Sequence, residues 1–176
     1  VEAAVEAMRG EILTQGPFLK AFQEEFAEYV GTDYALGVSS CTGALEIATQ
    51  LLEIREGDEV IVPAITFIAT IIPLLRVKAK VVFADLDPAT HLISPASIEA
   101  QITDRTKAIL VVHMNGMPCD MDGILKLARK RSIRVIEDAA HAFGSYYGDR
   151  LVGSFGDISC FSFDPIKSIT CGEGGV

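Results

Sequence analysis

Short apolar runs alternate with segments of helical periodicity along almost the whole chain, and this alternation constrains the fold more than any other feature. Most of the runs are continuously apolar, which is typical of parallel strands that are buried on both faces. The expected strands lie at 34–38, 56–63, 79–87, 107–113, 133–138 and 157–163, and the expected helices at 17–30, 39–54, 66–77, 94–103 and 120–131. The pattern predicts an α/β fold with a mostly parallel sheet and helices on both faces.

Prolines and glycines mark the ends of some of these helices. Pro17 stands near the start of a helix whose apolar residues recur at every fourth position, and Gly31 closes it. Pro73 falls inside the helical pattern at 66–77, so we expect this helix to be interrupted there.

Composition and charge narrow the range of partners. The chain is 49% hydrophobic and 22% charged, as expected of a soluble globular protein. Its formal net charge of −9 argues against nucleic acid or an anionic membrane as the main partner. The apolar segments are too short to span a bilayer, and the acidic start does not resemble a signal peptide. We therefore expect a cytoplasmic protein with no nucleic-acid or membrane partner.

The cysteines and histidines indicate neither a disulfide framework nor a metal site. The cysteines lack the C-x-x-C spacing of metal and redox motifs, and the histidines are widely spread. These residues are Cys41, Cys119, Cys160, Cys171, His91, His113 and His141. We therefore expect reduced cysteines and no bound metal.

In an open parallel sheet, ligands bind at the carboxyl ends of the strands. The segments 39–43, 64–67, 137–141 and 164–167 each follow an expected strand, so they should meet at one edge. The first of them, with the sequence SSCTG, leads into a helix. Its small residues either cap that helix or present free backbone N–H groups to a phosphate.

Three polar side chains in these segments could carry chemistry. Asp138 ends a buried strand, so its carboxylate either caps the next turn or needs a cation, a metal or a protonated ring nitrogen. His141 is either a packing residue or a ligand, and Lys167 is either a solvated residue or a reactive amine. Together with the aromatic Phe67, they suit pyridoxal 5'-phosphate (PLP), which needs a lysine, an acid partner and phosphate anchors.

Several stretches also carry a family resemblance, and the pairing of EDAAHA with FSF, a lysine and GEGG is the most specific of them. The stretches include SSCTGALEIA, GDEVIVPAITFIAT, VIEDAAHAFGSYYGDRLVGSFGD and FSFDPIKSITCGEGG, and the similarity runs over nearly the whole chain. They resemble the DegT/DnrJ/EryC1/StrS family of sugar aminotransferases. The resemblance implies the fold-type I architecture of PLP-dependent enzymes.

The resemblance also implies a role for each matching residue. Lys167 matches the lysine that forms the Schiff base with PLP, and Asp138 matches the aspartate that pairs with the pyridine nitrogen. Ser162 matches a serine that binds the phosphate, and Thr42 with Gly43 matches the loop whose amides hold it.

Two further positions match the cofactor site, and two positions depart from the family pattern. Phe67 matches the aromatic residue that stacks on the ring, and His141 matches a position beside the ring. Cys41 stands where the family usually has the glycine of Ser-Gly-Thr. Asn115 stands where many members have tyrosine, which indicates a different substrate pocket.

The function implied is a PLP-dependent aminotransferase that moves an amino group from glutamate or glutamine to a keto-sugar, usually nucleotide-linked. Relatives of this kind serve cell-envelope polysaccharide or antibiotic sugar biosynthesis. A PLP-dependent sugar dehydratase is an alternative, although such relatives carry histidine where this chain has Lys167. A PLP-binding module without catalytic activity, and a metal-dependent hydrolase using Asp138, His141 and Glu173, are the remaining alternatives.

The resemblance implies that residues 1–176 are the PLP-binding large domain of a homodimer. The helix at 18–30 supports a dimer, because its aromatic stripe leaves apolar surface to be covered. The sequence begins inside a helical pattern and ends where a new strand is expected, so we expect both ends to be cut and the C-terminal small domain to lie outside this chain.

Overall fold

The computed structural model describes residues 2–12 and 14–176, which form two compact units, one ending at Gly37 and one beginning at Val38. The first unit consists of α1 (Glu2–Arg9) and α2 (Pro17–Val30). A proline fits the first turn of α2, and the helix ends where Gly31 adopts a left-handed conformation with a φ of 84°. The helix predicted at 17–30 is confirmed.

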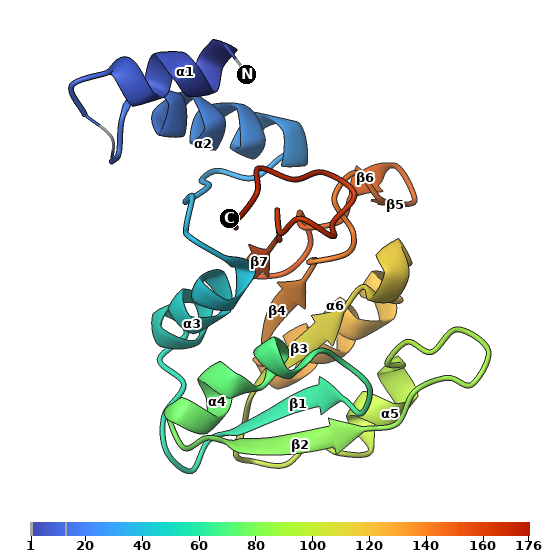
Figure 1. Cartoon of the computed structure of the whole chain (residues 1–176). Helices are drawn as coiled ribbons and strands as arrows, with labels where there is room; N and C mark the ends of the chain where they lie inside the picture. Colours follow the sequence, from blue (N-terminus) through green and yellow to red (C-terminus); the bar gives the residue numbers. More distant parts are fainter. Residues whose placement is uncertain (1, 13) are drawn as a thin grey trace. The chain divides into compact units, whose positions relative to one another are not determined.

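The second unit is built on a 5-stranded parallel sheet with the strand order β2-β1-β3-β4-β7 (Figure 1). Its strands are β1 (Glu59–Pro63), β2 (Lys80–Ala84), β3 (Thr106–Val112), β4 (Arg134–Asp138) and β7 (Ile158–Cys160). The parallel sheet predicted from the continuous apolar runs is confirmed. Separate from it lies a short antiparallel hairpin of β5 (Tyr146–Tyr147) and β6 (Arg150–Leu151), which the sequence pattern did not predict.

Helices cover both faces of this sheet, as predicted. One face packs against α3 (Cys41–Leu51), the 3-10 turn η1 (Ile68–Thr70) and α4 (Ile72–Arg76), and the other against α5 (Pro95–Glu99) and α6 (Met121–Arg131). Because successive side chains of a strand point to opposite faces, Val60 and Val62 pack in the cluster with α3, while Ile61 packs in the cluster with α6.

The structure corrects two element predictions. Residues 34–38 do not form a strand, and only Val38 makes an isolated bridge, to Gly175. The segment 66–77 is not one helix broken at Pro73. It is the turn η1 followed by α4, and the proline lies in the first turn of α4, where its missing N–H costs nothing.

Within residues 2–12 and 14–176, no helix combines the length and the apolar character needed to cross a membrane.

The central strand β3 should set the stability of the second unit. Ile109 is fully buried on β3, so Ile109→Ala should lower the free energy of unfolding by about 2–5 kcal/mol, through lost burial and the cavity left behind. Leu51 on α3 is 66% exposed, so the control Leu51→Ala should change it by no more than about 0.5 kcal/mol. Urea unfolding followed by circular dichroism measures both, and equal midpoints for the two variants would contradict this view of the core.

Candidate active site

The end of β4 carries a buried carboxylate. Asp138 is 5% exposed, and its two oxygens accept hydrogen bonds from the Thr70 hydroxyl at 2.8 Å and from the Ala140 N–H at 3.2 Å. Thr66 lies 2.6 Å from Thr70, oxygen to oxygen, so the Thr66 hydroxyl can donate to Thr70 while Thr70 donates to Asp138. Among the described residues, no cation forms an ion pair with Asp138.

This environment disfavours the charged form of Asp138. Burial raises the pKa of its carboxyl group, and the hydrogen bonds from Thr70 and Ala140 oppose the rise only in part. A carboxylate in this position is stabilised by any ligand that brings a protonated nitrogen to it.

Lys167 and His141 lie near Asp138. Burial and the positive charge of Lys167 lower the pKa of His141, while Asp138 acts in the opposite direction. Burial raises the pKa of the Cys41 thiol, Asp138 raises it further, and Lys167 opposes the rise. These electrostatic effects indicate that Lys167, Asp138, His141 and Cys41 lie close together. The order of the strands predicted that their segments would meet at one edge of the sheet.

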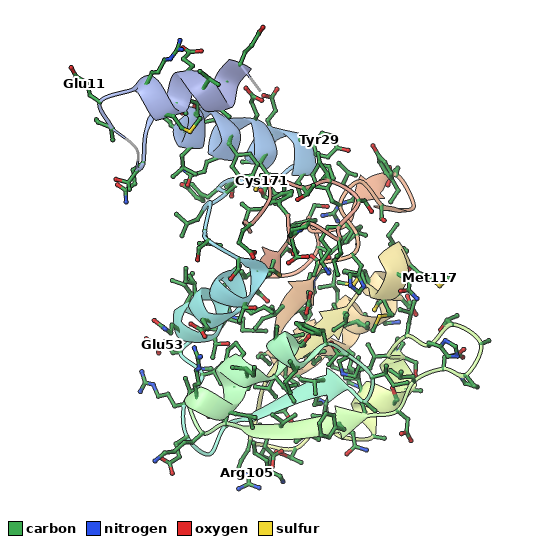
Figure 2. All side chains as sticks on the ribbon, in the orientation of Figure 1. Glu11, Tyr29, Glu53, Arg105, Met117 and Cys171 are labelled. Atoms are coloured by element: carbon green, nitrogen blue, oxygen red, sulfur yellow. The ribbon has the colours of Figure 1, made fainter. Side chains whose placement is uncertain are left out.

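The lysine stands on a loop that is mostly exposed. The loop follows β7 over 164–173, and Cys171 marks its far part in Figure 2. The backbone at Lys167 forms a local turn, because the Lys167 N–H donates to the Asp164 carbonyl at 3.0 Å. Lys167 itself is half-buried, while its neighbours in the loop are exposed.

The start of α3 forms a second part of the site. Ser40 caps this helix, and its hydroxyl accepts the N–H of Gly43 at 3.2 Å. The N–H groups of Cys41 and Thr42 also lie in the first turn, where a helix offers no carbonyl partner. The helix start therefore presents backbone donors and the positive end of its dipole, which together suit a phosphate.

Gly175 brings Ser162 to this helix start. It makes antiparallel bridges both to Val38, just before α3, and to Ser162, just after β7. A Cβ at Gly175 would lie only 2.5 Å from the Cys41 nitrogen and 2.4 Å from the Ser40 carbonyl carbon. The glycine thus permits a close approach that any side chain would prevent.

Phe67 lies at the start of η1, on the same turn that supports Asp138. The Phe67 carbonyl accepts the N–H of Thr70 at 3.1 Å, and Thr70 in turn donates to Asp138. Phe67 is 71% exposed, so its side chain is accessible to a flat ligand.

Thr70 is a site residue that the sequence analysis missed. It stands three positions after Phe67 as an isolated polar residue in an apolar helical pattern, and that isolation was the available signal. The hydrogen bond from Thr70 to Asp138 joins residues 68 positions apart, and the spacing of residues along the sequence does not predict such a contact.

The metal-hydrolase alternative has no support here. Among the described residues, no group of three or more histidine, cysteine, aspartate or glutamate side chains could hold a metal ion. Glu173, which that alternative requires, is exposed on the loop after Lys167.

The parallel sheet and the helices that cover it have the fold of PLP-dependent aminotransferases. A putative sugar aminotransferase from Streptococcus pneumoniae, solved in its PLP form, matches with a TM-score of 0.95 at 33% identity, over 99% of this chain and 48% of that chain. The aminotransferase from Psychrobacter cryohalolentis matches with a TM-score of 0.89 at 48% identity, over 91% of this chain and 41% of that chain.

The chain belongs to the DegT/DnrJ/EryC1/StrS aminotransferase family, whose sequence profile matches residues 1–176. The GDP-perosamine synthase of Escherichia coli O157:H7 is 48% identical over 165 residues, which are 94% of this chain and 45% of that protein. The chain spans about half the length of the curated relatives it matches. The family and fold expected from the sequence are confirmed.

The raised pKa of Asp138 predicts how stability depends on pH. Since ionising Asp138 costs more in the folded protein than in the unfolded chain, the free energy of unfolding should fall as the pH rises through the raised pKa. Asp138→Asn cannot ionise, so without added cofactor it should lack this fall. Urea unfolding between about pH 4 and pH 8 measures the difference. The exposed Asp149→Asn serves as control, and parallel pH profiles for wild type and Asp138→Asn would contradict the assignment.

Proposed function

We propose that this protein is a PLP-dependent aminotransferase that moves an amino group from glutamate or glutamine to a nucleotide-linked keto-sugar. The observation that carries the proposal is that Lys167 lies in the same site as the buried Asp138, with which no cation among the described residues forms an ion pair. The amino-sugar names of the relatives, such as GDP-perosamine synthase, support the substrate class. Residues 1–176 are then the PLP-binding large domain.

The residues present fit PLP. Asp138 would pair with the protonated ring nitrogen, and that pairing removes the cost of its burial. The start of α3, with Thr42 and Gly43, would hold the phosphate together with Ser162. Phe67 would stack on the ring, and His141 would lie beside it.

Bound PLP supplies an aldehyde that exchanges amino groups and a ring that withdraws electrons. Lys167 would hold the cofactor covalently through Nζ until the amino donor displaces it. The amine of Lys167 would then serve as the base that moves the proton at Cα of the donor. Asp138 would keep the ring nitrogen protonated throughout, since its carboxylate has no competing cation among the described residues.

The lysine assignment can be tested directly. The protein with added PLP should be yellow, and borohydride should fix the cofactor irreversibly on the peptide that contains Lys167. Lys167→Ala should still bind PLP through the phosphate site but form no adduct and show no transamination. Mass spectrometry locates the adduct, and the control is Lys78→Ala, which changes an exposed lysine in the turn between α4 and β2. An adduct on another lysine would overturn the proposal.

The aspartate can be tested separately from the lysine. Asp138→Asn should fold and still give the borohydride adduct on Lys167, but it should lose most of its transamination. An ion pair in a partly buried site is worth roughly 4 kcal/mol before desolvation costs, so the expected loss is large. Wild-type turnover in Asp138→Asn, measured with keto-sugar nucleotides and glutamate or glutamine, would show that Asp138 does not serve the ring nitrogen.

We further propose a homodimer. Several large apolar side chains on or next to η1, α4 and the edge strand β2 are about half exposed or more, and such surface is usually covered in a partner. They are Ile65, Ile68, Leu75 and Phe83. Sedimentation of the full protein at micromolar concentration should show a dimer, and a monomer alone would contradict this.

A further inference from the structure

One nitrogen of the His141 ring is already in use. The backbone N–H of Asn115 donates to Nδ1 of His141 at 3.4 Å. An imidazole nitrogen that accepts an N–H carries no proton of its own, so the ring proton of the neutral form lies on Nε2. A charged imidazolium would place two donors against each other at this contact.

The donor belongs to a turn with an unusual backbone. The turn η2 (Met114–Gly116) follows β3, and Met117 directly after it is labelled in Figure 2. Asn115 has a φ of 54° and Gly116 a φ of 81°, both in the left-handed region. Asparagine and glycine tolerate this region, whereas a β-branched residue does not.

The turn also packs directly against the histidine. A Cβ at Gly116 would lie 3.1 Å from the His141 carbonyl oxygen and 3.4 Å from the Ser145 hydroxyl. The fit is therefore close on the Gly116 side, while the Asn115 side chain itself is exposed. The backbone of residue 115, rather than its side chain, makes the contact with His141.

The charged groups around His141 are few. Lys167, from the loop after β7, favours the neutral ring, and Asp138, from β4, favours the charged ring. The turn itself consists of methionine, asparagine and glycine, so it adds no ionisable side chain. The Asn115 N–H therefore acts in the same direction as Lys167.

We propose that the Met114–Gly116 turn is a positioning element that acts through His141. Its Asn115 N–H holds the imidazole as the neutral tautomer with the proton on Nε2, so that His141 offers a bound molecule a single hydrogen-bond donor. The role toward the cofactor rests on the proposed function, because the bound molecule is then PLP held between Asp138 and Lys167. The tautomer itself does not depend on that function.

Nitrogen-15 NMR of protein labelled at histidine reads the tautomer directly. At neutral pH, His141 should show a protonated Nε2 and an unprotonated Nδ1, and His141→Gln identifies its signals. Asn115→Gly should preserve this pattern, because glycine accepts the left-handed backbone. Asn115→Val changes an equally exposed side chain but disfavours that backbone, so it should give mixed tautomers and a higher pKa for His141.

Gly116→Ala gives a second route to the same result, because its Cβ should displace the turn from His141. The tautomer of His113, whose Nε2 faces Glu137 and whose Nδ1 accepts the Cys119 N–H, should stay unchanged in every variant and thereby report an intact core. A proton on Nδ1 of His141 in the wild type, or identical titrations of His141 in Asn115→Gly and Asn115→Val, would overturn the proposal.

The consequence for the cofactor is measured by PLP absorbance across pH. Because a ring with a higher pKa becomes charged sooner on acidification, the acid limit of PLP binding should move to higher pH in Asn115→Val than in Asn115→Gly. If the NMR result holds and no PLP binds to any variant, the proposed function fails while the assignment of the tautomer stands. If PLP binds with the same acid limit in both variants, the turn has no role in binding.

Discussion

Two adjacent carboxylates at the end of β4 are both removed from water. The hydrogen bonds that each receives decide which one holds the strands of the second unit together and which one is left for a ligand. Glu137 and Asp138 point to opposite faces of the sheet, because side chains alternate along a strand. Burial alone would raise the pKa of Glu137, but hydrogen bonds from His113 and from the amides of Gly156 and Gly153 lower it below its usual range. Asp138 has only two such bonds, and its pKa is raised.

Glu137 therefore stays charged and holds elements together. Its oxygens accept hydrogen bonds from His113 at the end of β3, from Ser159 on β7, and from three amides in the loop before β7. His113 cannot turn away, because its Nδ1 accepts the N–H of Cys119 at 3.1 Å. The Glu137 carboxylate thus links β3, β4 and β7 near their carboxyl ends, close to Asp138 and Ser162.

Asp138 is the member of the pair that remains available for a ligand. Its cost of burial is only partly offset by Thr70 and Ala140, so a positive group at this place would gain most from binding. The difference between the two carboxylates also separates structure from chemistry along one strand. On the face of the sheet that packs against α6, Glu137 is satisfied by hydrogen bonds. On the face that packs against α3 and η1, Asp138 lies in the candidate site.

Much of this arrangement could be predicted from the sequence, because it follows from local patterns. Continuous apolar runs gave the parallel strands, and their order along the chain was enough to bring residues such as Asp138 and Lys167 to one edge. Contacts that depend on tertiary packing could not be predicted. The hydrogen bond from Thr70 to Asp138 is one example, and the pairing of residue 38 with Gly175, in place of a regular strand, is another.

The thiol of Cys41 lies beside the candidate site without adding charge to it. Cys41 is the first residue of α3 and lies within the electrostatic reach of both Asp138 and Lys167. A charged thiolate there would compete with Asp138 for any positive group. Burial and the nearby carboxylate raise the pKa of the Cys41 thiol instead, so it remains neutral. The backbone donors at the start of α3 do not depend on the side chain, so the Cys41 thiol adds volume beside the proposed phosphate site without altering its charge.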